Sequence, residues 1–186
     1  MEGRCVFISG GARSGKSLFA QDLAAKLSEK VLFVATAEIL DDDMRLRIDK
    51  HRRERPESWR TLECPYDISV HMEKIIGDAE VVIIDCVTLL VSNLMHGDQR
   101  DSLEDDELDI AELEPRVLQE VESLLRLMSK SGAAYIIVSN EVGLGIVPEN
   151  RAGRVYRDIL GRANQILAGY ADEVYFMIAG IPVKVK

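Results

Sequence analysis

A glycine-rich segment near the N-terminus constrains the fold more than any other part of the chain. Residues 5–8 are apolar and residues 18–23 have a helical composition, so the segment between them joins a buried strand to a helix. It fits the pattern G-x-x-x-x-G-K-[ST], with the sequence Gly10-Gly11-Ala12-Arg13-Ser14-Gly15-Lys16-Ser17. Because glycine tolerates backbone angles that a β-carbon disfavours, successive N–H groups of such a loop can converge on phosphate oxygens. The sequence therefore predicts a phosphate-binding loop, called the P-loop below.

Two side chains of the P-loop have predicted roles in binding a nucleoside triphosphate. Lys16 is expected to neutralise the β and γ phosphates, and Ser17 is expected to bind Mg²⁺. The alternative is a glycine-rich turn with an incidental lysine. The complete motif, placed between a strand and a helix, disfavours that alternative.

A second strand ends in a carboxylate. Residues 81–84 are Val-Val-Ile-Ile and Asp85 follows them, which is the hydrophobic run plus aspartate of the Walker-B pattern. That pattern predicts Asp85 near the Mg²⁺ ion beside Ser17. Taken alone it is common, and a strand-ending aspartate is about as often a helix cap. The complete P-loop favours the metal role.

Strand and helix patterns alternate along the chain, which predicts an α/β fold. The expected strands are residues 4–9, 31–35, 59–63, 81–85 and 134–139, and the expected helices are residues 16–27, 44–53, 67–76, 88–95, 113–130 and 151–170. Residues 174–178 and 183–185 are expected to form a closing hairpin around Gly180. The predicted fold is a P-loop NTPase, RecA-like, with a mostly parallel sheet flanked by helices and an antiparallel hairpin at its edge. Residues 1–186 are expected to form a single domain.

Composition and charge narrow the class of protein. The net charge is −9, of which residues 98–114 contribute −8 through nine acidic residues and one basic residue. This acidity argues against binding nucleic acid through a basic surface, and we interpret it as a local solvated loop and helix start. No apolar stretch is long enough to span a membrane, and the first strand begins too early for a signal peptide. Three cysteines without C-x-x-C spacing suggest neither disulfides nor zinc, so a cytoplasmic enzyme is expected.

One histidine lies among cations on the second predicted helix. The segment Lys50-His51-Arg52-Arg53-Glu54-Arg55 places His51 where neighbouring positive charges disfavour imidazolium, and a neutral imidazole can attack phosphorus. Simple phosphoryl transfer needs no such nucleophile. From the residues alone, a solvated basic helix explains His51 better than catalysis does.

Several motifs along the chain, the P-loop among them, form a distinctive combination. They are Gly10 to Ser17, Ala35-Thr36-Ala37, Asp42-Asp43-Met44 with Arg47-Ile48, His51-Arg52 with Arg55-Pro56 and Trp59, Asn140-Glu141-Val142-Gly143, and Gly145-Ile146-Val147-Pro148-Glu149-Asn150-Arg151. This combination resembles the bifunctional adenosylcobinamide kinase / adenosylcobinamide-phosphate guanylyltransferase family of cobalamin biosynthesis. The likeness runs from about residue 4 to residue 186, and the block from Asn140 to Arg151 is its most specific part.

The resemblance implies two successive reactions. Enzymes of that family phosphorylate adenosylcobinamide with GTP or ATP and then transfer GMP from GTP to the product through a guanylylated histidine, which gives adenosylcobinamide-GDP. By position His51 matches the nucleophile, with Lys16 as the second catalytic residue. The matching nucleotide-binding positions are Gly10, Gly11, Ala12, Arg13, Ser14, Gly15, Lys16, Ser17, Ala35, Thr36, Ala37, Arg52, Arg53, Glu54, Arg55, Glu63 and Asp85. Mg²⁺ is the implied cofactor, and a homo-oligomer, a trimer by resemblance, is the implied assembly.

Further sequence features bear on the nucleophile, the nucleotide base and the acceptor. Related enzymes can have a second histidine just before the nucleophile, where this chain has Lys50, so only His51 can serve here. No [NT]-K-x-D motif explains a preference for guanine. The sequence does not identify the residues of the corrinoid pocket, although the loop from Asn140 to Arg151 is the first place to look for it. A monofunctional small-molecule kinase and a nucleotide-driven RecA-like interaction module remain as alternative functions.

Overall fold

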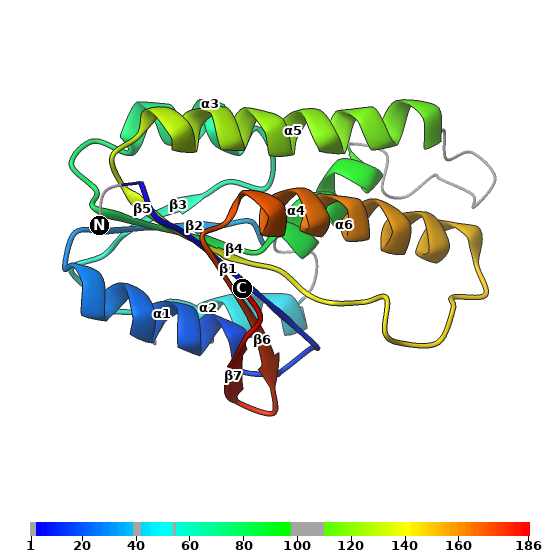
Figure 1. Cartoon of the computed structure of the whole chain (residues 1–186), viewed down its shortest axis with the longest axis horizontal. Coiled ribbons are helices and arrows are strands. Elements are labelled where there is room, and N and C mark those ends of the chain that lie inside the picture. The colour runs from blue at the N-terminus through cyan, green and yellow to red at the C-terminus, as the bar shows by residue number, and fades with distance from the viewer. Residues whose placement is uncertain (1–2, 39–41, 54, 98–109) are drawn as a thin grey trace.

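The structure is a computed structural model that describes residues 3–38, 42–53, 55–97 and 110–186. Thirteen helices and strands follow one another along these residues (Figure 1). In chain order they are β1 (Cys5–Gly10), α1 (Lys16–Leu27), β2 (Val31–Ala35), α2 (Asp42–Arg53), β3 (Arg60–Glu63), α3 (Ile68–Ile75), β4 (Val81–Asp85), α4 (Val87–His96), α5 (Ile110–Lys130), β5 (Ala134–Val138), α6 (Arg151–Tyr170), β6 (Glu173–Ile178) and β7 (Ile181–Lys184).

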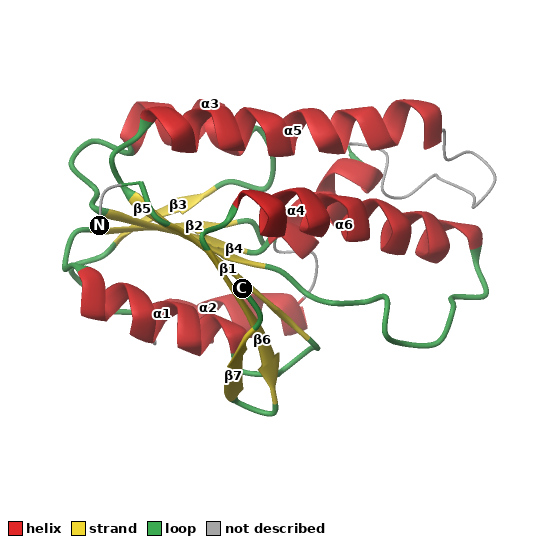
Figure 2. Cartoon of the chain, viewed as in Figure 1, coloured by secondary structure: helices red, strands yellow, loops and turns green. Residues whose placement is uncertain are grey.

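The strands form one sheet in the order β3-β2-β4-β5-β1-β6-β7. Six strands are parallel to their neighbours, and only the last pair, β6 with β7, is antiparallel. Figure 2 shows this sheet as the central layer, with the β6–β7 hairpin projecting at one side. The predicted P-loop NTPase fold, with a mostly parallel sheet and a C-terminal hairpin at its edge, is confirmed.

Helices cover both faces of the sheet. Helices α1 and α2 lie on one face, and α3, α4, α5 and α6 lie on the other (Figure 1). Successive residues of a strand point to opposite faces, so Phe7 packs in the core under α3 to α6 while Ile8 packs in the core under α1. Burial on both faces explains why the central strands are continuously apolar in sequence.

The observed elements depart from the predicted ones mainly at their ends. Strand β3 begins at Arg60, one residue after the predicted start, and α5 begins at Ile110, three residues before it. Helix ends are poorly defined by local patterns, and the acidic residues around Leu113 obscured the start of α5. In the acidic segment 98–114, residues 98–109 lie outside the described residues. Residues 110–114 form the first turns of α5.

The strand register brings the predicted site residues into one row. Glu63 of β3 pairs with Ala35 of β2, Ala35 pairs with Asp85 of β4, and Asp85 pairs with Val138 of β5. Val138 pairs with Ile8, two residues before the P-loop. The carboxyl ends of the parallel strands therefore form one edge, called the carboxyl edge, where ligands bind in open α/β sheets. Among the described residues, no helix combines the length and the apolar character that crossing a membrane requires.

Candidate functional site

The P-loop owes its shape to two glycines that pack against the C-terminal hairpin. Gly10 has φ 148° and Gly15 has φ 90°, values that L side chains rarely adopt. A β-carbon on Gly10 would lie 2.7 Å from the carbonyl oxygen of Met177, and one on Gly15 would lie 3.3 Å from the Cα of Gly180. The backbone N–H of Gly180 also donates to the carbonyl of Ser14 at 3.0 Å. The β6–β7 hairpin therefore packs against the P-loop and supports its shape, a role that the sequence did not reveal.

The ammonium group of Lys16 is held inside the P-loop. Its Nζ donates to the carbonyl oxygen of Gly11 at 2.6 Å and lies 3.4 Å from the hydroxyl of Ser14. The residue is buried, and this burial lowers the pKa of Lys16, although the negative charge of Asp85 opposes the shift. A desolvated ammonium group at the N-terminus of a helix is suited to bind an anion.

Asp85 is a carboxyl group that several predicted catalytic and nucleotide-binding side chains influence. Burial raises the pKa of this carboxyl group, while the hydrogen bond from Ser17 opposes the rise, as do the electrostatic effects of His51, Arg55 and Lys16. Four predicted site residues therefore act on the Asp85 carboxyl group at the carboxyl edge. The sequence predicted each of them separately, and the tertiary structure brings them together.

A helix-capping role for Asp85 finds no support in the structure. The N-cap residue of α4 is Cys86, and no side chain donates or accepts a capping bond there. The carboxylate instead takes the hydroxyl of Ser17 as its partner. A serine hydroxyl and an aspartate in contact fit the few protein ligands that Mg²⁺ accepts beside nucleotide phosphates. Within the described ranges, no group of three or more His, Cys, Asp or Glu side chains forms an all-protein metal site.

Helix α2 carries His51 on an exposed surface near this cluster. The end of the helix is tied to the sheet, because Arg52 forms an ion pair with Glu63 at the end of β3. Arg53 is exposed, and Glu54 lies outside the described residues. The predicted nucleophile and two predicted nucleotide-binding residues thus share one helix that stands over the carboxyl edge.

Arg55 has an unusual environment for a cation. Its guanidinium lies 3.7 Å from the centroid of the Phe33 ring, and within the described part of the chain its Nε and Nη1 atoms are buried without a hydrogen-bond partner. Burial lowers the pKa of Arg55. Because unpaired buried donors cost stability, this guanidinium is better suited to a ligand than to the fold.

A cavity of about 710 Å³ adjoins Arg55. It is lined by Arg52, Arg53, Arg55, Pro56, Glu57, Trp59, Thr61 and Glu63. Three arginines in one wall favour an anionic ligand. Four predicted nucleotide-binding residues therefore face a common space.

The Ala35–Ala37 segment reaches the edge through its backbone. Thr36 is fully buried, and its hydroxyl donates to the carbonyl of Cys86 and accepts from the N–H of the same residue, both at 2.7 Å. Asn93 of α4 donates to the carbonyl of Thr36 at 2.8 Å. These bonds fix the end of β2 against β4, so the Thr36 side chain serves the fold. Ala37 is half-buried at the edge.

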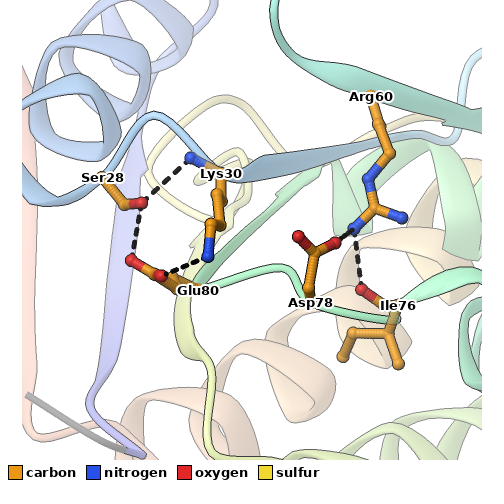
Figure 3. Close-up of polar contacts among 6 residues, drawn as sticks. All are labelled: Ser28, Lys30, Arg60, Ile76, Asp78 and Glu80. Carbon is orange, nitrogen blue, oxygen red and sulfur yellow. Dashed lines mark hydrogen bonds and ion pairs between the residues drawn. The ribbon is translucent and has the colours of Figure 1, made fainter.

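A second cavity, of about 750 Å³, lies at the opposite, amino edge of the sheet, between the ends of α1, α3 and α5. Beside it, the exposed side chains of Lys30, Arg60, Asp78 and Glu80 form ion pairs (Figure 3). Glu80 accepts from Ser28 at 2.9 Å and lies 3.1 Å from the Nζ of Lys30, while Arg60 lies 3.2 Å from Asp78. This cavity is larger, but it lacks the desolvated, unpaired groups that mark a reactive site.

Comparison with known proteins shows the family to which the chain belongs. Residues 6–185 match the family described as cobinamide kinase / cobinamide phosphate guanyltransferase. The bifunctional adenosylcobalamin biosynthesis protein CobU of Escherichia coli is 44% identical over 183 residues, which cover 97% of this chain and 99% of that protein. CobU of Salmonella typhimurium is 40% identical with the same coverage, and CobP of Pseudomonas aeruginosa is 36% identical over 96% of this chain and 95% of its own length.

Proposed function

This chain is an enzyme of the cobinamide kinase / cobinamide phosphate guanyltransferase family, and we propose that it catalyses both reactions of that name. In the first, adenosylcobinamide is phosphorylated with GTP or ATP. In the second, GMP is transferred from GTP to the phosphorylated product. The observation that carries the proposal is the carboxyl edge itself, where Asp85 lies in register with Ala35 and Glu63 beside the P-loop that holds Lys16.

The nucleotide is proposed to bind with its triphosphate along the P-loop. Lys16 holds the β and γ phosphates, and Arg55 lends its unpaired N–H groups to phosphate oxygens. The remaining contacts come from the backbone of residues 10–17 and 35–37 and from Arg52, Arg53, Glu54 and Glu63. Ser17 and Asp85 hold Mg²⁺, which supplies charge neutralisation at the phosphate oxygens when it is bound.

In the kinase reaction, the alcohol oxygen of the acceptor attacks the γ phosphorus. The bond between that phosphorus and the β-γ bridging oxygen breaks, the nucleoside diphosphate leaves, and the alcohol proton passes to solvent. Protein catalysis here consists of positioning and charge stabilisation. Lys16 provides both, because its ammonium is fixed inside the loop.

In the guanylyl transfer, an imidazole nitrogen of His51 attacks the α phosphorus of GTP. A P–N bond forms, the α-β phosphoanhydride bond breaks, and pyrophosphate leaves from the P-loop. A phosphate oxygen of the phosphorylated acceptor then attacks the same phosphorus and releases His51. One P-loop serves both reactions because it holds the β and γ phosphates in each.

Labelling with GTP that carries ³²P at the α position tests the histidine directly. The unsubstituted protein is expected to form an acid-labile, alkali-stable adduct, and His51→Ala is expected to form none while still phosphorylating adenosylcobinamide with ATP. His71→Ala is the matched control, because His71 lies on α3 with its Nδ1 3.0 Å from the carbonyl of Asp67. An adduct on His51→Ala would refute the assignment. Phosphorylation without adduct or pyrophosphate in the unsubstituted protein would identify a monofunctional kinase, and slow hydrolysis alone would identify a nucleotide-driven module.

We further propose a homo-oligomer, a trimer by family resemblance, in the cytoplasm. Support comes from apolar side chains left exposed on the C-terminal hairpin and its end, namely Ile178, Ile181, Val183 and Val185. Light scattering coupled to size exclusion tests the assembly. A monomer at micromolar concentration would contradict it.

A further inference from the structure

A buried polar cluster lies where β5 leaves the sheet. Its members are Thr88 at the start of α4, Ser139 after β5 and Asn164 in the middle of α6, with 6%, 0% and 9% of each residue exposed. The hydroxyl of Ser139 donates to Oδ1 of Asn164 at 2.7 Å, and the hydroxyl of Tyr156 donates to the carbonyl of Thr88 at 3.1 Å. Because buried polar side chains are costly unless bonded, the cluster has a specific structural task.

That task is to hold the backbone of Asn140. The N–H of Asn140 donates to Oγ1 of Thr88 at 2.7 Å, and Nδ2 of Asn164 donates to its carbonyl oxygen at 3.0 Å. The bond from Ser139 to Oδ1 orients the Asn164 amide so that its nitrogen faces this carbonyl. Two helices thus fix both polar backbone groups of one residue.

The next residue connects this anchor to the P-loop. The N–H of Glu141 donates to the carbonyl of Gly10, the first residue of the P-loop motif, at 3.0 Å. Fixing Asn140 therefore also fixes the distance between the P-loop and the segment 140–150, which we call the acceptor loop.

The far end of the acceptor loop is fixed as well. Nη1 of Arg154 donates to the carbonyls of Pro148 and Glu149 at 3.0 and 2.5 Å. Asn150 caps α6 by accepting from the N–H of Gly153 at 2.9 Å, and a β-carbon on Gly153 would lie 2.5 Å from that amide oxygen. Both ends are thus anchored by polar contacts to α6.

Between these anchors the loop presents an apolar tip. Leu144, Ile146 and Val147 have 81%, 96% and 58% of their surface exposed. Residues 140–149 contain two glutamates and neither lysine nor arginine, so the loop does not attract phosphates. Apolar side chains on a loop whose first residues are bonded to the P-loop are suited to a large acceptor that is mostly uncharged.

We propose that Thr88 and Asn164 are positioning residues that hold the acceptor loop at a fixed distance from the P-loop, and that its tip contacts the alcohol acceptor and not the nucleotide. This inference rests on the proposed function for the identity of the acceptor. It predicts that the two substrates respond differently to the same substitution.

The test compares Thr88→Val with Thr88→Ser. Valine keeps the shape of threonine but leaves the N–H of Asn140 buried without its acceptor, whereas serine keeps the acceptor. Thr88→Val and Asn164→Leu are expected to raise the KM for adenosylcobinamide at least tenfold, in phosphorylation with ATP. Labelling of the protein by α-³²P GTP without acceptor is expected to change less than twofold, and Thr88→Ser is expected to behave as the unsubstituted protein.

Two further variants separate positioning from general destabilisation. Glu120→Ala removes a buried carboxylate that accepts from the N–H of Ile68 at 2.7 Å, so it lowers the thermal midpoint without changing the KM of either substrate. Ile146→Ser changes only an exposed side chain and is expected to raise the acceptor KM with an unchanged thermal midpoint.

The inference is overturned if the KM for the acceptor and the KM for ATP rise together in Thr88→Val, or if Ile146→Ser leaves the acceptor KM unchanged. The proposed function is judged separately on the unsubstituted protein, through its adduct and its phosphorylated product. The kinase readout does not need the histidine adduct. A protein that phosphorylates the acceptor but forms no adduct therefore still decides the inference.

Discussion

At the carboxyl edge, burial lowers the pKa of Lys16 and raises the pKa of Asp85, so both charged forms are disfavoured. At the amino edge, the hydrogen bond between Lys30 and Glu80 raises the pKa of the lysine and lowers that of the glutamate, so both charged forms are favoured. A lysine and a carboxylate residue therefore have opposite roles at the two edges. Charges of the amino edge stabilise the fold and are screened by water, whereas those of the carboxyl edge are held in a costly state that a ligand can relieve.

The arginines show the same contrast. Arg60 donates to the carbonyl of Ile76 at 2.9 Å (Figure 3). It also donates to the carbonyl of Ile75 at 3.0 Å, and together these bonds close the end of α3. Arg55 has two buried guanidinium nitrogens, Nε and Nη1, without hydrogen-bond partners among the described residues. Functional sites commonly lower the stability of a protein. The two edges allow this trade-off between function and stability to be measured within one sheet.

The largest expected effect comes from Lys16→Met. Loss of the ammonium is expected to reduce kcat/KM of the kinase reaction by about 10³-fold, since it removes charge stabilisation of the transferred phosphoryl group. The thermal midpoint is expected to stay equal or rise, because no cation is then buried. Lys30→Met is the control and should leave kcat/KM unchanged. If Lys16→Met lowered the midpoint by many degrees, its charge would serve the fold, and the contrast between the edges would fail.

The second prediction compares the same substitution at two arginines, Arg55 and Arg60. Arg55→Met is expected to weaken triphosphate binding by about tenfold, which corresponds to about 1.4 kcal/mol, with a small change in thermal midpoint. Arg60→Met is expected to lower the midpoint by about 2–4 °C, as loss of about 1 kcal/mol does in a chain of this size, with unchanged affinity. Calorimetric titration and thermal scans measure both quantities. Equal losses of affinity in the two variants would contradict the division.

A smaller effect concerns Glu120, a buried carboxylate of α5 beside the start of α3. Burial raises its pKa above the ordinary 4.5, although the N–H of Ile68 opposes the shift. A raised carboxyl pKa means that its contribution to stability is complete below pH 4.5 and is lost as the pH rises through the folded-state value. Glu120→Gln is therefore expected to gain free energy of unfolding relative to the unsubstituted protein between pH 4.5 and pH 7, measured by urea titration. A constant difference across that range would argue against the burial effect.

The smallest effect is expected for Glu80→Gln, and it has the opposite sign. The pKa of Glu80 is lowered, so its contribution is present above pH 4.5 and is lost as the pH falls through the lower folded-state value. The variant should be slightly less stable than the unsubstituted protein at pH 7, and the difference should vanish in about 1 M salt, because exposed pairs are screened. A difference in stability that persists in salt would show that the Glu80 charge is not screened, as is expected of a buried charge.

Much of the fold was predictable because it depends on local patterns. The run from Val81 to Ile84 predicted a buried strand, and Gly10 to Ser17 predicted a strand-to-helix loop; both lie where expected. The start of α5 was missed by three residues, because Glu112 and Glu114 continue the acidic run that was assigned to a solvated loop and helix start. Polar residues at inward helix positions, such as Asn164 beside Ala163, were a signal of the loop anchor that the sequence analysis did not use.

By itself the sequence determined the P-loop, the alternation of strands and helices, and the chemical types at the site, because motif spacing and periodicity are properties of neighbouring residues. Only the tertiary structure decided which of these residues meet. The strand order places the end of β4 where Asp85 reaches Ser17, a contact between residues 68 positions apart. The packing of the chain also places the Arg55 guanidinium over the ring of Phe33 and the backbone of Gly10 against Met177. Such contacts depend on how the sheet and helices pack over the whole chain, which no local pattern encodes.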